Sequence, residues 1–266
     1  MTDPYQSKAW QDRPLEPVYC TVRSGAMHYK ARVGVKVGHK ALYNILWINP
    51  SGMKEVPGMY IPGSEGADFW SQVPSDLHGR GLKNILVACT DNLKGFTEAI
   101  PGVYPKAGVQ SCIVHQVRNS LKYLAGKDRK GFMRGLKPVY RAGLEGLAQK
   151  WQGKYPIVIR SRQDNRDRPS TYFQYTAPVR KLIHTTKAVE GHHRQIGKMT
   201  KAKGAFTSDM ALQKPVYLAT GNIEKKWASP LQDWGLTVRQ PAIEFGHRLP
   251  LDLPGRPILE GADQKS

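Results

Sequence analysis

The chain has 266 residues, 40% of them hydrophobic, which suits one large domain or two modest ones with a substantial core. No apolar stretch approaches the ~20 residues of a membrane-spanning helix, and the first residues lack the charged and apolar regions of a signal peptide. These features argue against a membrane protein, so we expect a cytoplasmic location. Three scattered cysteines fit a reducing compartment.

Positive charge is concentrated in one third of the chain. The whole sequence has 40 Lys and Arg against 21 Asp and Glu, and residues 114–203 alone contain 21 basic and 5 acidic residues. A field of this kind attracts polyanions, of which nucleic acid is the commonest. The alternative is a set of solvated helix faces, although these usually intersperse both signs. We therefore expect a nucleic-acid partner.

The first half of the chain is rich in short apolar runs separated by turn signals. Such runs predict a meander of three strands with short connections. The runs are Pro17–Val22, Met27–Val37, Ala41–Ile48 and Glu55–Ile61, with a strong turn signal at Asn49–Gly52. Helical spacing follows over Asp68–Leu77.

The next apolar run, Ile85–Cys89, is short, branched and uncharged, as a buried strand would be, and Asp91 follows it. Catalytic groups in open α/β sheets lie at the carboxyl ends of strands. Asp91 is therefore either a functional carboxylate or the N-cap of a helix over Phe96–Ile100. A further strand is expected at Val109–Val114. Together these elements predict an α/β fold with a mixed sheet.

The second half of the chain is predicted to be mostly helical. Residues 118–158 are helical by composition, and Lys187–Met199 has an apolar face that includes His192. Ser208 is a plausible N-cap for a last helix. Pro215 falls inside that helix and is expected to weaken it.

Five segments carry a family pattern when they are read together: Trp10–Tyr19, Ala26–Lys30, Ala88–Ile100, Gln110–Ser120 and Thr185–Glu190. The pattern resembles the mutator-type transposases of bacterial insertion sequences, from about Trp10 to Leu249. Cys112-x-x-His115 within its longer context is quite specific. The resemblance implies an RNase H-like fold. It also implies Mg²⁺-dependent DNA cleavage and strand transfer by two aspartates and a glutamate that hold two ions.

In this pattern Asp91 resembles the second aspartate and Glu190 the glutamate, and both would be catalytic and metal-binding. Mg²⁺ prefers hard oxygen ligands, which suits carboxylates. Glu190 is the only acidic residue between Asp167 and Asp209. From the residues alone, it is either a metal ligand or an ordinary salt-bridge partner.

The resemblance also implies a division of the chain. A catalytic core is expected in two parts, 17–118 and 185–246, with a basic helical insertion at 119–184 and tails at 1–16 and 247–266. Double-stranded DNA is the implied partner, both element ends and target, and a homo-oligomer is a further candidate. The residues expected to bind DNA are Arg118, Lys122, Arg194 and Lys198, with His193 as an alternative to Arg194 as a phosphate contact.

The first aspartate of the family pattern is missing from this chain. It should immediately precede Ala26-Met27-His28, where Gly25 stands instead. Glycine offers no side-chain oxygen, so a two-metal site would lose a ligand. Other departures from the pattern are Arg162, Arg166, Pro169, Lys187, Gly197 and Pro215.

The N-terminal region that recognises element ends is also expected to be absent. We therefore expect a truncated and catalytically impaired transposase. The alternative is a non-catalytic DNA-binding remnant that could interfere with an intact transposase.

Cys112 and His115 have two interpretations. A structural zinc site needs four ligands, usually in two close pairs, and the remaining cysteines and histidines are not spaced in that way. No zinc is expected. We expect instead that Cys112 packs in the core and that His115 supports the floor of the active site.

Overall fold

The computed structural model describes residues 4–33, 36–63, 66–90, 95–142, 145–164, 175–183, 186–201 and 204–249. Its strands are β1 (Val18–Val33), β2 (Lys36–Ile48), β3 (Lys54–Tyr60), β4 (Asn84–Thr90) and β5 (Gly108–Ser111). Its helices are α1 (Pro4–Gln11), α2 (Ala67–Gly79), α3 (Phe96–Val103), α4 (Ile113–Lys122), α5 (Gly126–Ala142), α6 (Glu145–Trp151), α7 (Pro156–Asp164), α9 (Ala177–Ile183), α10 (Thr186–Lys201), α11 (Asp209–Glu224) and α12 (Trp234–Phe245), followed by the 3-10 turn η1 (Gly246–Arg248). None of these described helices is both long and apolar enough to cross a bilayer.

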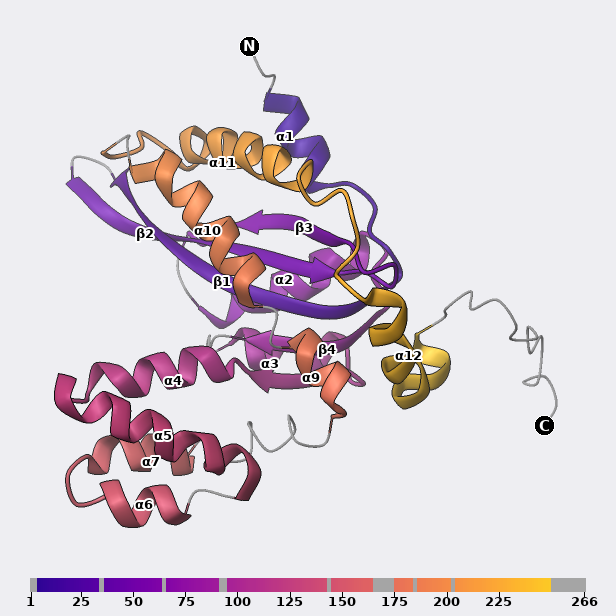
Figure 1. The fold of residues 1–266 in the computed structure, drawn as a ribbon. Helices are drawn as coiled ribbons and strands as arrows, with labels where there is room; N and C mark the ends of the chain where they lie inside the picture. Colours follow the sequence, from indigo (N-terminus) through magenta and orange to yellow (C-terminus); the bar gives the residue numbers. More distant parts are fainter. Residues whose placement is uncertain are drawn as a thin grey trace.

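The described strands form a five-stranded mixed sheet in the order β3-β2-β1-β4-β5 (Figure 1). Strand β2 runs antiparallel to both β1 and β3. Strand β4 runs parallel to its neighbours β1 and β5, and helices α2 and α3 provide the connections on either side of it. The predicted mixed α/β fold is confirmed.

Strand β1 is continuous, although the sequence predicts separate runs at Pro17–Val22 and Met27–Val37. Residues 23–26 are small or polar and interrupt the apolar pattern. They nevertheless remain in the strand because they pair with β2, and Arg23 also pairs with Cys89 of β4. The predicted meander of three strands is confirmed as β1, β2 and β3, and central-strand pairing outweighs the local composition of residues 23–26.

Helices cover both faces of the sheet (Figure 1). On one face, Trp70 of α2 and Phe96 of α3 belong to an apolar cluster with Trp47 of β2. On the other face, Ile196 of α10 clusters with Leu42 of β2 and with α11. Side chains alternate between the two faces of a strand, so β2 supplies both layers. Helix α10 is thereby held against the sheet.

Helices α4 to α7 form a lobe beside the sheet (Figure 1). The lobe has its own apolar cluster, with Phe132 of α5, Trp151 of α6 and Ile159 of α7. Its first helix begins earlier than the sequence predicts. Strand β5 ends at Ser111 and α4 begins after Cys112, so the expected strand Val109–Val114 is too long. Apolar residues at the start of an amphipathic helix mimic the end of a strand.

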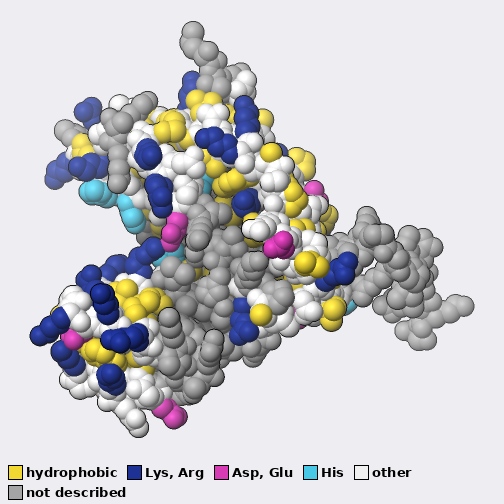
Figure 2. Space-filling model, viewed as in Figure 1, with side chains coloured by type: hydrophobic (Ala, Val, Ile, Leu, Met, Phe, Trp, Pro, Cys, Tyr) yellow, Lys and Arg dark blue, Asp and Glu magenta, His cyan; other side chains and the backbone are white. Residues whose placement is uncertain are grey.

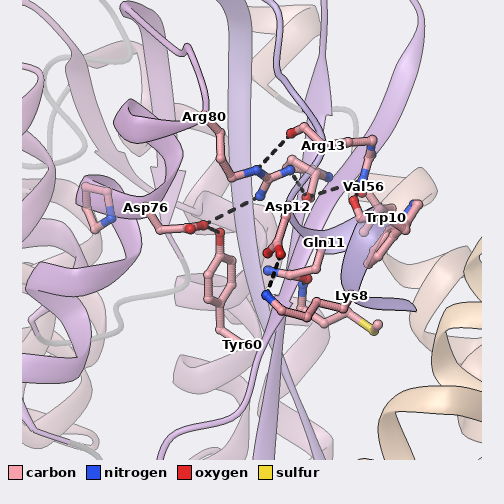
Figure 3. A network of polar contacts seen from close by, with 12 residues as sticks. Lys8, Trp10, Gln11, Asp12, Arg13, Val56, Tyr60, Asp76 and Arg80 are labelled. Atoms are coloured by element: carbon pink, nitrogen blue, oxygen red, sulfur yellow. Dashed lines mark hydrogen bonds and ion pairs between the residues drawn. The ribbon is translucent and has the colours of Figure 1, made fainter. Parts of the chain in front are cut away.

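The expected N-terminal tail includes helix α1, which a polar network ties to the core (Figure 3). The Met59 N–H donates to Gln11 Oε1 (2.9 Å), and Arg13 Nη2 donates to the Val56 carbonyl (2.9 Å). Arg80 Nε donates in turn to the Arg13 carbonyl (3.0 Å). Because β3 lies at the edge of the sheet, these contacts satisfy backbone groups that would otherwise be exposed for pairing.

Helix α11 continues through Pro215 without a break, and the expectation that this proline weakens the helix stays a prediction. A proline removes one helical hydrogen bond and costs about 3 kcal/mol in an isolated helix. Here Leu212, Val216 and Ile223 are buried against the sheet. Their burial offsets the local cost.

Ser208 caps α11 as the sequence predicts, because its Oγ accepts a hydrogen bond from the Ala211 N–H (3.1 Å). We expect Ser208→Ala to lower the free energy of unfolding by about 1 kcal/mol, since that N–H loses its acceptor. Urea denaturation measures the change. The exposed neighbour Thr207 is the control, and Thr207→Ala should be nearly neutral. Equal effects for the two substitutions would contradict the capping role.

Candidate active site

A cavity of about 310 Å³ lies where β1, α4 and α10 meet. Figure 2 shows a hollow between the α4–α7 lobe and the helices above it, with Lys and Arg side chains gathered on its rim. Seven of the residues that the sequence singles out line the cavity: Gly25, Cys112, His115, Arg118, Glu190, His193 and Arg194. The fold therefore brings together positions up to 169 residues apart in the sequence.

Gly25 lies in the middle of β1, opposite Asn44 of β2, and is buried. A Cβ built on this glycine would overlap the imidazole of His193, which comes from α10. Burial lowers the pKa of His193 to about 4, and the electrostatic effect of the nearby His115 acts in the same direction but is smaller. The ring is therefore neutral at pH 7. A neutral ring fills the space next to the position at which the first aspartate is expected from the sequence.

Glu190 forms an ion pair within the cavity. Arg118 Nη2 of α4 lies 2.7 Å from Glu190 Oε1 of α10. The two side chains are 52% and 37% exposed, so water screens the pair and its contribution to stability is small. The pair links the lobe to α10 across the cavity. Of the two interpretations open for Glu190, the structure contains the salt bridge.

Cys112 lies at the junction of β5 and α4, where its N–H donates to the Thr90 carbonyl (2.6 Å). Its side chain is buried, as expected. A hydrogen bond from the Cys89 thiol lowers the pKa of Cys112, and His115 and the Arg23 guanidinium act in the same direction against burial. His115 reaches the same cavity from the first turn of α4. Its supporting role stays a prediction.

His192 and His193 point to different surroundings, because adjacent residues on a helix are about 100° apart. His192 is 1% exposed, and its Nε2 lies 3.2 Å from Thr220 Oγ1 of α11. Burial lowers the pKa of His192 to about 3. It is a neutral core residue that joins α10 to α11, whereas His193 faces the cavity.

Two polar residues of β1, Arg23 and Ser24, also line the cavity, and sequence analysis did not identify them. They are 4% and 5% exposed. Among the described residues, no hydrogen-bond partner is found for Arg23 Nε and Nη2 or for Ser24 Oγ. No local sequence signal identifies them, because an arginine and a serine after an apolar run do not reveal their own burial.

The residues predicted to bind DNA divide into two groups. Arg118 and Arg194 line the cavity. Lys122, at the end of α4, is exposed and donates to Asn119 Oδ1 (3.0 Å), and Lys198 is exposed on α10. The two lysines are not part of the cavity lining. Their contact with DNA stays a prediction.

The described residues do not fit a two-metal site. Glu190 is the only carboxylate among the described lining residues, and it is already paired with Arg118. No group of three or more His, Cys, Asp or Glu side chains that could hold an ion occurs in the described part of the chain. Asp91, the other predicted ligand, lies outside the described residues, as do Arg166 and Pro169.

Comparisons with a family profile and with individual proteins all match this chain to transposases. The sequence profile described as "Transposase, Mutator family" matches residues 4–230. The chain is 37% identical over 248 residues to the transposase for insertion sequence element ISRM3 of Rhizobium meliloti (strain 1021), which covers 90% of this chain and 62% of that protein. It is 33% identical over 229 residues to a probable insertion-element transposase of Corynebacterium diphtheriae, covering 83% and 67% of the two chains.

A more distant relative is the transposase for insertion sequence element IS256 in transposon Tn4001 of Staphylococcus aureus, with 22% identity over 231 residues, or 82% of this chain and 58% of that one. The chain thus spans about three fifths of the length of the first relatives it matches. The profile match covers the five described strands, the α4–α7 lobe and helices α9 to α11. The chain belongs to the Mutator family of transposases.

Proposed function

We propose that this chain is the RNase H-like core region of an insertion-sequence transposase that binds double-stranded DNA but is impaired in cleaving it. In an intact site of this kind, Asp91, Glu190 and a third carboxylate would hold Mg²⁺, which polarises phosphoryl oxygens and activates the attacking hydroxyl. The described residues around the cavity do not fit such ions.

One observation carries the proposed impairment. Gly25 supplies no carboxylate to the cavity, and the His193 ring occupies the space into which a side chain at that position would extend. Glu190 is also neutralised by Arg118. A site built to hold cations needs an excess of carboxylate oxygens. The described lining has an excess of guanidinium groups instead.

DNA binding is supported by the distribution of charge. Lys and Arg side chains gather on the α4–α7 lobe (Figure 2). On α5, the exposed Lys127, Lys130 and Arg134 are spaced by three and four residues and therefore share a face. These positive side chains can contact the phosphate backbone, which dominates non-specific affinity for DNA. We propose this face as the first contact with the duplex.

A nicking assay on supercoiled plasmid tests the proposal. We expect the unmodified chain to shift the plasmid in a gel but to produce no Mg²⁺-dependent nicks above the level of the matched Glu190→Gln variant. Cleavage by the unmodified chain that Glu190→Gln abolishes would show that the site is intact and that the proposed impairment is wrong. Failure to shift DNA would contradict the proposed binding.

The second candidate function is non-catalytic DNA binding that interferes with an intact transposase. The charge of the lobe favours it as well, because binding needs only the basic surface and no carboxylate ligands. The nicking assay does not distinguish the two, because both expect a plasmid shift without metal-dependent nicks. Adding the chain to an intact transposase does, since only the second function lowers the rate at which that transposase cleaves its DNA.

A further inference from the structure

We infer that the cavity between β1, α4 and α10 binds the phosphate group of a nucleic-acid strand directly, through side-chain donors and without a bridging metal ion. This inference rests on the proposed DNA-binding function for the source of the phosphate. The phosphate-binding part of the inference depends only on the residues that line the cavity.

Arg23 is the central observation. Its side chain is 4% exposed and lines the cavity, yet Nε and Nη2 have no hydrogen-bond partner among the described residues. Burying a charged group is costly unless it is paired, and native structures leave few buried donors unsatisfied. Two unsatisfied nitrogens of one guanidinium are suited to the two oxygens of a phosphate, because its rigid fork matches that spacing.

Two more donors reach the same cavity. Ser24 Oγ and His193 Nε2 are buried and, within the described parts of the chain, also have no hydrogen-bond partner. A serine hydroxyl and a neutral imidazole can each donate one hydrogen bond. Unsatisfied donors from β1 and α10 therefore converge on one cavity of about 310 Å³. A single anion with several acceptor oxygens would satisfy all of them.

The charge of the described lining also favours an anion. It contains the guanidinium groups of Arg23, Arg118 and Arg194, against the carboxylate of Glu190. Cys112 lines the cavity too, and its thiolate would add one negative charge. Three positive charges still exceed two negative ones. Gly25 leaves this balance unchanged, whereas an aspartate there would have cancelled the excess.

Calorimetric titration in EDTA tests the inference, with inorganic phosphate as the first ligand. We expect saturable binding to the unmodified chain. Glu190→Gln should raise the affinity roughly fivefold or more, because it removes a negative charge near the ligand and leaves Arg118 free to bind. Arg23→Met should abolish binding, and its melting temperature checks that the buried substitution has not unfolded the chain.

Tighter phosphate binding by Glu190→Gln cannot result from structural damage, because damage weakens binding. Glu190 is also partly exposed, so its replacement should not unfold the chain. Absence of saturable phosphate binding in both the unmodified chain and Glu190→Gln overturns the inference. Weaker binding by Glu190→Gln also overturns it.

Competition by hexanucleotides identifies the source of the phosphate. Competition by a 5′-phosphorylated strand alone assigns the cavity to a strand end, and equal competition by the unphosphorylated strand assigns it to the backbone. Competition by neither overturns the inference. Plasmid binding by the α5 face is measured separately. If the chain binds phosphate but not plasmid, the proposed DNA-binding function is contradicted and phosphate binding by the cavity is supported.

Discussion

The double variant Gly25→Asp/His193→Ala is expected to nick supercoiled plasmid in the presence of Mg²⁺ on the order of a hundredfold faster than the unmodified chain. A metal ligand in such a site contributes several kcal/mol to transition-state stabilisation, and each 1.4 kcal/mol is a factor of ten in rate. The double change is needed because the His193 ring occupies the space that a side chain at Gly25 requires. Plasmid relaxation followed on agarose gels measures the rate.

The single variant Gly25→Asp should gain less. Its Cβ would overlap the His193 imidazole, so the ring must rotate away before the carboxylate can enter the cavity. Gly25→Asn/His193→Ala is the matched control, because it has the same shape without the charge and should remain inactive. Equal nicking by the Asp and Asn double variants would show that the gain does not come from a restored ligand.

The triple variant Lys127→Ala/Lys130→Ala/Arg134→Ala is expected to reduce the salt dependence of DNA binding. Each lost phosphate contact lowers the slope of log Kobs against log salt by about one, so the slope should fall by up to about three. These side chains are exposed on one face of α5, and their removal should not disturb the apolar cluster of the lobe. Fluorescence anisotropy with labelled duplex DNA across a salt series measures the slope.

A control with equal charge loss comes from the charge-balanced end of the chain. Lys214, Lys225 and Arg239 are also exposed, and their triple replacement by Ala removes three positive charges. We expect this control to leave the slope nearly unchanged. Equal reductions by both triple variants would indicate that net charge, and not the α5 face, governs binding.

Much of the architecture follows from local sequence patterns. The run Ile85–Cys89 is part of a buried central strand, Lys187–Met199 lies within α10, and Ser208 caps α11. These predictions succeed because burial and capping leave strong local signals. The continuity of β1 between Val22 and Met27 has no such local signal, because pairing with neighbouring strands holds the small and polar residues there. No local pattern encodes that pairing.

The candidate site also contains residues that the sequence identified and residues that it did not. Its residues Gly25, Cys112 and Glu190 follow from the family pattern in the sequence, and the structure places all three around one cavity. The roles of Asp91 and Glu190 as metal ligands stay predictions. Arg23 was missed, because a single arginine in a strand region has no meaning until its neighbours are known.

The sequence by itself determined the family, the concentration of positive charge and the absence of an acidic side chain at Gly25, because these depend only on residue identity and order. Only the tertiary structure decided what replaces that side chain. It places the His193 ring over Gly25, pairs Glu190 with Arg118 and leaves Arg23 buried in the cavity. These contacts join residues far apart in the sequence. They arise from the packing of α10 and α4 around β1, which local patterns do not specify.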